Sequence, residues 1–215
     1  PDSYANRAWI NQKWLDELGL KEPTTSEELV KVLKAFKERD PNSNGKTDEI
    51  PMAGANGGWN TNPITYLMNQ FVYCSNVDVG TIYYSRLVDG KIDATFDNDE
   101  WRDGLRFIKS LVDEGLLSTL SFTQDESQYS AMVSGETQII GVGISGSISM
   151  FQNNKVDYTP LGAVEGSNGA SWFTYTPQLP VAMVAITKDC KSPDLAFRWM
   201  DVGYTEDYSM IARFG

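Results

Sequence analysis

The sequence contains no histidine, and its 18 Lys and Arg residues are outnumbered by 29 Asp and Glu. Without histidine, the chain lacks the commonest general base and the commonest zinc ligand. The net charge is −11 and no basic cluster is present, whereas phosphate binding needs concentrated Lys and Arg. We therefore expect no nucleic-acid partner.

Cysteine is scarce as well. Cys74 and Cys190 lie far apart in the chain and form no metal-binding motif. They form either one disulfide or two free buried thiols, and the sequence leaves both interpretations open.

Long apolar runs are also missing, and no stretch is long enough to span a bilayer. Apolar residues still make up 41% of the chain, enough for a core in one large domain or two small ones. The first residues are not a signal peptide, and the last four fall within a helical pattern. We expect the chain to be cut from a longer protein.

The most informative segment that is present is the oxygen-rich stretch DPNSNGKTDEIP at residues 40–51. Oxygen-bearing side chains alternate along it and two carboxylates close it, at Asp40, Asn42, Asn44, Asp48 and Glu49. Alternate side chains of a curling loop point inward, and a hard cation such as Ca²⁺ takes six to eight oxygens at about 2.3–2.6 Å. The segment predicts a calcium loop that clamps the end of the preceding helix. The alternative is a solvated Asn-Gly turn.

Hydrophobic periodicity predicts alternating strands and helices, and hence an α/β layered domain. Helices are predicted over about 11–19, 25–39, 98–115 and 125–135, with further helices starting near Pro63 and Ser192. Strands are predicted over 8–10, 137–142, 157–164 and 180–187, and Asp89-Gly90 predicts a hairpin. Trp14, Trp101 and Trp199 lie on apolar helix faces and are predicted to be core.

Several segments, taken in order, resemble one protein family. They are WINQKWLDELGL at 9–20, the DPNSNGKTDEIP loop, WRDGLRFIKSLVDEGLL at 101–117, SAMVSGETQIIGVG at 130–143 and TKDCKSPDLAFRWMD at 187–201. Together they resemble the extracellular solute-binding proteins (family 1) of bacterial ABC importers, in the branch of oligosaccharide-binding lipoproteins. The resemblance extends over nearly the whole chain, and its first and last segments are the most specific.

This resemblance implies a periplasmic-binding-protein-like (type II) α/β fold, in which two lobes joined by hinge strands enclose a solute. Residues 1–215 would be mostly the second lobe, with residues 180–215 crossing back toward the other. The implied function is non-catalytic: binding of an oligosaccharide or other small solute and delivery to ABC permease subunits by cleft closure. The implied location is the outer surface of a Gram-positive bacterium, with a lipid anchor outside this chain.

The resemblance also implies the ligands of a structural Ca²⁺ ion. They would be Asp40, Asn42, Asn44, the Lys46 carbonyl, Asp48 and Glu49. The loop departs from an EF-hand, because Pro51 stands where a bidentate Glu is expected. Glu49, two places earlier, would have to replace that ligand.

A sugar site needs aromatic planes for the C–H faces of the rings and polar groups for the hydroxyls. The candidates are Trp59 and Asn60 in a Gly- and Asn-rich segment, Trp172 in GASWFTY, Ser145 and Ser147 after a predicted strand, and Tyr129 at a helix start. Small-residue loops at strand ends are where ligand clefts of α/β proteins form. For each candidate the alternative is core packing or plain surface.

Two other functions stay open. A glycoside hydrolase fragment would use carboxylates at 97–100 or at Asp125-Glu126, but these fall at helix starts, where negative charge complements the helix dipole. A calcium-dependent adhesion module would be favoured by repeated calcium loops, and the chain has one such loop. We therefore predict a binding protein rather than an enzyme.

Overall fold

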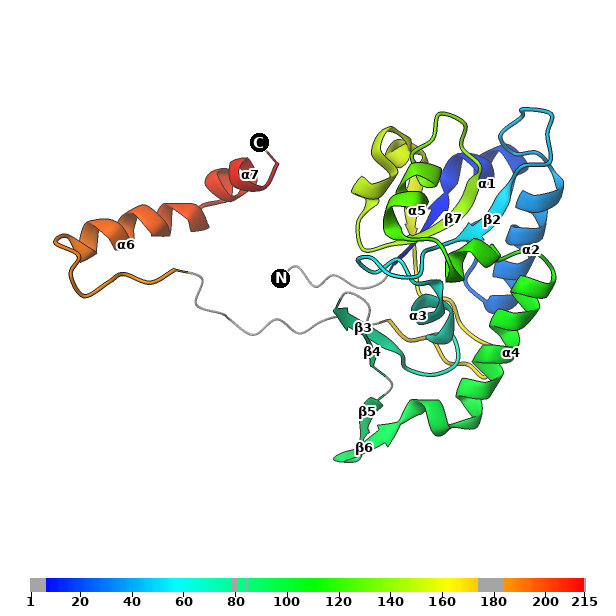
Figure 1. The fold of residues 1–215 in the computed structure, drawn as a ribbon, viewed down its shortest axis with the longest axis horizontal. Coiled ribbons are helices and arrows are strands. Elements are labelled where there is room, and N and C mark those ends of the chain that lie inside the picture. The colour runs from blue at the N-terminus through cyan, green and yellow to red at the C-terminus, as the bar shows by residue number, and fades with distance from the viewer. Residues whose placement is uncertain (1–6, 79–80, 84, 174–183, 215) are drawn as a thin grey trace. The chain divides into compact units, whose positions relative to one another are not determined.

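The structure is a computed structural model that describes residues 7–78, 81–83, 85–173 and 184–214. It divides into two units, Pro1–Pro177 and Gln178–Gly215. The first is a layered α/β unit and the second contains two short helices (Figure 1). The α/β class predicted from the sequence is confirmed.

A mixed four-stranded sheet organises the first unit. Its strands are β1 (Arg7–Asn11), β2 (Ile50–Ala53), β7 (Ile140–Ser145) and β8 (Tyr158–Leu161), in the order β2-β7-β1-β8. β2 runs parallel to β7, whereas β1 is antiparallel to both of its neighbours. Three of these strands were expected, with β7 starting three residues later than predicted. β2 was missed, because it is short and contains Pro51, which weakens a strand signal.

The helices of the first unit are α1 (Gln12–Leu18), α2 (Ser26–Glu38), α3 (Pro63–Met68), α4 (Asp99–Asp113) and α5 (Glu126–Val133). Short 3₁₀ turns lie at Thr95–Asp97, Thr119–Phe122 and Ile148–Asp157. α1 and α2 begin where predicted because side-chain caps satisfy free backbone N–H groups, whereas Asn98 at the start of α4 makes no side-chain cap. Asn11 accepts a hydrogen bond from the Trp14 N–H at 3.1 Å, and Thr25 accepts one from the Glu28 N–H at 3.2 Å.

Two β-hairpins connect α3 to α4. They are β3 (Ser75–Asp78) with β4 (Thr81–Tyr83), and β5 (Ser85–Val88) with β6 (Lys91–Ala94). In the second hairpin, Asp89 and Gly90 both adopt left-handed backbone, with φ of 50° and 76°. Such turns favour Asp-Gly because both central residues need positive φ. This hairpin confirms the prediction, whereas β3 and β4 were not predicted.

The sheet separates two apolar clusters. One face packs Ile10, Met52, Val142 and Ile144 against α1, α2 and α3, and the opposite face packs Trp9, Ala53, Tyr129 and Phe151 together with α5. The alternation of neighbouring residues such as Trp9 and Ile10 follows from the period of two in a strand. The three-layer arrangement leaves the carboxyl end of β7 beside α5.

The second unit contains α6 (Pro193–Asp201), a 3₁₀ turn (Val202–Tyr204) and α7 (Glu206–Phe214). The helix predicted near Ser192 is confirmed. Residues 180–183 of the predicted strand lie outside the described residues, and 184–187 have no regular secondary structure. Whether residues 180–215 cross back toward another lobe stays a prediction.

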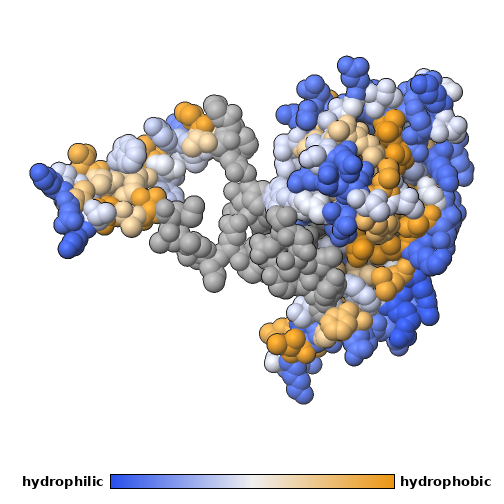
Figure 2. All heavy atoms as spheres, in the orientation of Figure 1, coloured by the Kyte–Doolittle hydropathy of each residue, from blue (hydrophilic) through white to orange (hydrophobic). Residues whose placement is uncertain are grey.

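Apolar side chains are exposed along the second unit (Figure 2). Phe197, Trp199 and Tyr204 are 61%, 77% and 89% exposed. The prediction that Trp199 is core is therefore wrong for the described residues, whose two short helices cannot enclose an aromatic side chain. Trp14, at 1% exposed, is core as predicted. No described helix has both the length and the apolar character needed to cross a membrane.

Both cysteines are free thiols in the structure. Cys74 is buried in the first unit, and burial raises the pKa of its thiol to about 12. A thiol with so high a pKa is unreactive near neutral pH, because the thiolate is the nucleophile.

We expect Phe36→Ala to destabilise the first unit by about 3–5 kcal/mol, since it removes a fully buried ring from the core. Phe36 packs edge-on against Trp14 at a centroid distance of 5.2 Å, so the loss also removes an aromatic pair. Urea unfolding followed by circular dichroism measures the effect. Lys31→Ala, on the exposed side of the same helix, should change stability by less than about 0.5 kcal/mol. Equal effects of the two changes would contradict the assigned core.

Candidate functional site

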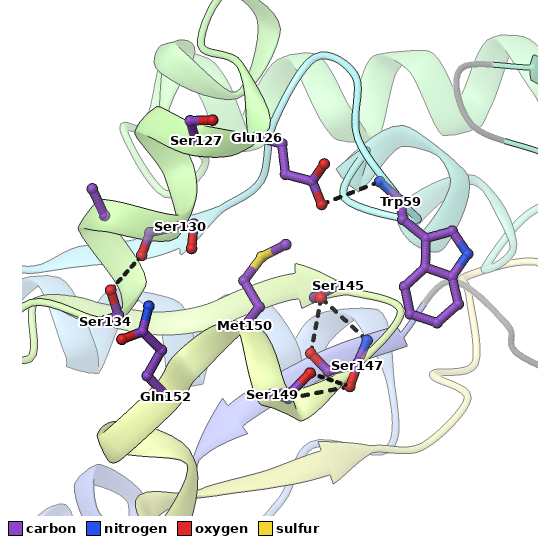
Figure 3. Close-up of a pocket in the computed structure, with 11 residues that line it drawn as sticks. Trp59, Glu126, Ser127, Ser130, Ser134, Ser145, Ser147, Ser149, Met150 and Gln152 are labelled. Atoms are coloured by element: carbon purple, nitrogen blue, oxygen red, sulfur yellow. Dashed lines mark hydrogen bonds between the residues drawn. The ribbon is translucent and has the colours of Figure 1, made fainter. Parts of the chain in front are cut away.

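An open pocket of about 740 Å³ lies at the carboxyl end of β7, between α5 and the segment that carries Trp59 (Figure 3). Its lining comprises Trp59, Glu126, Ser127, Ser130, Ala131, Ser134, Ser145, Ser147, Ser149, Met150 and Gln152. Serine hydroxyls thus dominate the wall, with one indole and one carboxylate among them. A strand end in an α/β sheet is where ligand clefts form.

Trp59 is held in place by the backbone of a glycine. A Cβ built on Gly146 would lie 2.8 Å from two atoms of the indole, closer than real Cβ atoms approach. The ring therefore lies directly against the Gly146 backbone, and the Gly146 N–H donates to the Trp59 carbonyl at 3.4 Å. Trp59 is still 36% exposed, so part of the indole remains open to a ligand.

The loop after β7 is ordered by its own hydroxyls. The Ser145 hydroxyl donates to the Ser147 carbonyl at 3.0 Å, and the Ser147 and Ser149 hydroxyls are 2.7 Å apart. Ser145 is buried, and its carbonyl accepts from the Trp9 indole N–H at 2.9 Å. This network holds the less buried Ser147 and Ser149 at the wall of the pocket (Figure 3).

Of the predicted sugar contacts, the structure brings Trp59, Ser145 and Ser147 together in this pocket. Tyr129 is a correction: it is 0% exposed and its hydroxyl donates to the Ala53 carbonyl at 3.2 Å. Burial raises the pKa of the Tyr129 phenol. Tyr129 sits in the core because it faces the sheet rather than the pocket side of α5. It cannot contact a ligand in this structure.

The other two predicted contacts lie outside the pocket. Asn60 is buried at 5% exposed, in left-handed backbone with φ of 56°. Trp172 is 44% exposed, packs edge-on against Tyr73 at 6.2 Å, and lines a different pocket with residues 85–88. Among the described residues, the two indoles thus line separate pockets, and a sugar contact at Trp172 stays a prediction.

The sequence interpretation missed Glu126 as a pocket residue. It treated Asp125-Glu126 as a helix start, but the capping box is formed by Asp125 with Gln128, the Asp125 carboxylate accepting from the Gln128 N–H at 2.8 Å, and does not involve Glu126. The Glu126 carboxylate instead turns toward the pocket (Figure 3). Ser127, Ser130 and Ser134 were missed too, although their spacing of three and four residues places them on one helix face. That polar stripe is the signal that could have revealed them.

Gln152 is a further missed residue of the lining. Its backbone has φ of 47° and ψ of −116°, a conformation that non-glycine residues rarely adopt. Such strained positions gather at ligand sites, where the surrounding structure maintains them. Nothing in the sequence around Gln152 indicates this conformation.

The oxygen-rich loop curls as predicted. Asp40, Ser43 and Gly45 have φ of 49°, 56° and 74°, which bends the chain around its own side chains. The two Asp40 carboxylate oxygens accept from the Asn44 and Gly45 N–H groups at 3.1 and 2.9 Å. Asn44 donates through its side-chain amide to Asp48 at 3.0 Å, and its Oδ1 accepts from the Lys46 N–H at 2.8 Å.

Glu49 is the unusual member of this loop. Both of its carboxylate oxygens are buried, and neither has a hydrogen-bond partner among the described residues. Burial raises the pKa of Glu49, and the nearby Asp40 and Asp48 carboxylates raise it further. An unpartnered buried carboxylate close to two others suits a cation. The described residues contain no group of three His, Cys, Asp or Glu side chains already arranged around a metal position, so Asn oxygens and carbonyls would have to complete the site.

The family model for the bacterial extracellular solute-binding proteins matches residues 3–210 of the sequence. The chain belongs to this family. The family resemblance drawn from the sequence is therefore confirmed, and so is the α/β fold that it implied.

Among named relatives, the fructooligosaccharide ABC transporter substrate-binding protein FusA of Streptococcus pneumoniae is 34% identical over 99% of this chain and 39% of its own length. Lipoprotein LipO of Bacillus subtilis is 31% identical over 76% of this chain and 33% of its own. The chain thus spans well under half the length of each of these two relatives.

Solved structures agree. A complex of FusA with kestose superposes with a TM-score of 0.71 at 32% identity, covering 97% of this chain and 41% of that one. An extracellular solute-binding protein of Bifidobacterium longum subsp. infantis gives a TM-score of 0.67 at 29% identity, covering 96% and 44%. Another FusA structure is of an EF-hand mutant with fructo-nystose.

We expect Gly146→Ala to lower stability by about 1–3 kcal/mol and to change the near-UV circular dichroism of tryptophan, because the new methyl group overlaps the Trp59 ring. The double variant Gly146→Ala with Trp59→Ala should recover most of the loss, since the clash disappears with the ring. Gly162→Ala is the matched control, because the nearest atom to its Cβ is 3.9 Å away. Failure of the double variant to recover stability would contradict the contact.

Proposed function

We propose that this chain is part of the oligosaccharide-binding component of an ABC importer. It binds the sugar without altering it, in the pocket beside Trp59, and the longer protein presents the ligand to the permease subunits. The observation that carries the proposal is the half-exposed Trp59 indole, fixed on Gly146 beside a wall of serine hydroxyls. An indole offers a plane for the C–H face of a sugar, and hydroxyls donate to and accept from its hydroxyl groups.

The described pocket supports binding rather than hydrolysis. Glycosidases use two carboxyl groups that face each other across the bond to be cleaved. The described lining contains one carboxylate, Glu126. The family and the FusA relative, a transporter substrate-binding protein, agree with a non-catalytic role.

The fraction of its relatives' length that the chain spans also bears on the mechanism of binding. The chain spans less than half the length of its FusA relative, and its pocket is open. One side of a sugar bound there would be left uncovered by this chain. We propose that the rest of the longer protein closes over that side and that the ligand shifts the hinge equilibrium toward the closed form. We also propose an extracellular position, which the description of the family supports, with a lipid anchor outside this chain on a Gram-positive cell.

We further propose that residues 40–49 hold a structural Ca²⁺ ion through Asp40, Asn42, Asn44, the Lys46 carbonyl, Asp48 and Glu49. The unpartnered Glu49 carboxylate supports this, because a cation would compensate its buried charge. A solved FusA structure is of an EF-hand mutant, which supports the proposal of a calcium loop. The Asn42 amide also donates to the Gln138 carbonyl at 3.1 Å, so an ion there would brace α2 against the entry to β7.

We expect Trp59→Ala in the full-length protein to weaken oligosaccharide binding at least about fivefold, since loss of a stacking partner removes about 1 kcal/mol or more. Isothermal titration calorimetry with a panel of neutral oligosaccharides that includes kestose measures this. Trp172→Ala is the parallel variant, because its indole lies outside the pocket.

A loss of affinity confined to Trp59→Ala assigns the sugar site to this pocket. Equal losses of affinity in both variants would extend the sugar site to both indoles. Unchanged affinity in Trp59→Ala, or no binding by wild type across the panel, would contradict the proposed function.

We expect 1 mM Ca²⁺ to raise the melting temperature of the EGTA-treated protein by about 5–11 °C. A ligand at a hundredfold its Kd adds about 2.7 kcal/mol, and each kcal/mol shifts the melting temperature of a chain of this size by about 2–4 °C. Glu49→Gln should lose most of this gain. Without Ca²⁺, Glu49→Gln should be at least as stable as wild type at pH 7, since the amide removes a buried charge beside Asp40 and Asp48.

Glu38→Gln, an exposed change at the end of α2, is the matched control and should keep the full Ca²⁺ response. Differential scanning calorimetry measures all three proteins. An identical melting temperature of the wild type with Ca²⁺ and with EGTA would argue against the ion.

A further inference from the structure

We propose that Glu126 makes the pocket selective for uncharged saccharides and excludes sugars that carry a carboxylate, such as uronic acids. This rests on the proposed saccharide function of the same pocket. It goes further in assigning selectivity against negatively charged ligands to one side chain. Sugar binding alone does not require such selectivity.

The first observation is the charge of the wall. Of the described lining residues, Glu126 alone has an acidic or basic side chain, and the others are serine, alanine, methionine, glutamine and tryptophan. Among the described ion pairs, none involves Glu126. A bound anion would therefore meet a negative charge in this wall and no compensating Lys or Arg.

The second observation is that Glu126 is fixed in place. Its Oε1 accepts from the Trp59 N–H at 3.4 Å. A Cβ built on Gly58 would lie 2.7–2.9 Å from three carbons of the Glu126 side chain, so the side chain packs directly along the Gly58 backbone. Gly58 has φ of 102°, which favours glycine and keeps that contact. Glu126 therefore cannot easily turn away from an incoming anion.

The third observation is where the carboxylate points. Figure 3 shows it between the serine side chains of α5 and Trp59. A sugar stacked on the indole would place its substituents beside Glu126. A neutral hydroxyl there donates a charge-assisted hydrogen bond to the carboxylate, whereas a sugar carboxylate is repelled by it.

The difference in affinity between neutral and negatively charged sugars depends on how far Glu126 is buried. Glu126 is half-buried, so its field is screened less than that of a surface charge. Specific sites commonly reject a wrong ligand through such a repulsive element as well as by attracting the right one. The alternative role for Glu126 is only to stabilise the start of α5 through the helix dipole, which would leave ligand charge without effect.

The experiment compares kestose with kestose oxidised to the carboxylate at its primary alcohols, on the full-length protein. In 50 mM NaCl, wild type should bind the oxidised form at least about tenfold more weakly, and Glu126→Gln should reduce that ratio to about threefold or less. The glutamine keeps an acceptor for the Trp59 N–H and removes the charge. Glu136→Gln, an exposed change after α5, is the matched control and should keep the wild-type ratio. An unchanged ratio in Glu126→Gln would overturn the proposal.

Quenching of Trp59 fluorescence gives a readout that needs no sugar. The Trp59 signal is taken as the difference between each protein and its Trp59→Phe variant. Iodide, an anion, should quench it at least about twofold more strongly in Glu126→Gln than in wild type, while neutral acrylamide quenches both equally. Equal iodide quenching would overturn the role of Glu126. Charge-dependent quenching without kestose binding by wild type would instead count against kestose as a ligand of the proposed function.

Discussion

The pairing of β7 with β2 on one side and β1 on the other is the interaction on which the rest of the first unit depends. It joins residues from positions 7, 50 and 140 into one sheet and closes both apolar clusters. Because β7 is paired on both sides, its carboxyl end is fixed relative to α5 and to the turn after β2. The position of Trp59 against Gly146 is a consequence of that pairing rather than of any local preference.

Two glutamates in this acidic chain have different environments and therefore different proposed roles. Both carboxylate oxygens of Glu49 are buried near two other carboxylates and have no hydrogen-bond partner among the described residues, a setting that would suit the proposed cation. Glu126 is half-buried, accepts from a backbone N–H and faces a polar wall. A carboxylate in that setting accepts hydrogen bonds from neutral hydroxyls and repels anions. The residue type is the same, and the neighbours decide its chemistry.

Local structure was largely readable from the sequence. Asn11, Thr25 and Asp125 cap helices that begin within one residue of the predicted positions, and Asp89-Gly90 forms the predicted hairpin. These features depend on residues within about four positions of one another, so their pattern is visible in the chain. β2 was missed because its stability comes from pairing with β7, almost ninety residues later in the chain, and not from its own four residues.

The candidate site likewise has some features that the sequence predicts and others that only the tertiary structure shows. By itself, the sequence determined the candidate calcium loop, the helix caps and the family, because closely spaced side chains carry each of these. Only the tertiary structure decided that Tyr129 is core, that Trp172 lies apart from Trp59, and that Glu126 faces a pocket. The physical reason is that the face of a helix or loop that becomes buried depends on the distant strands that pack against it, and a single sequence does not state that pairing.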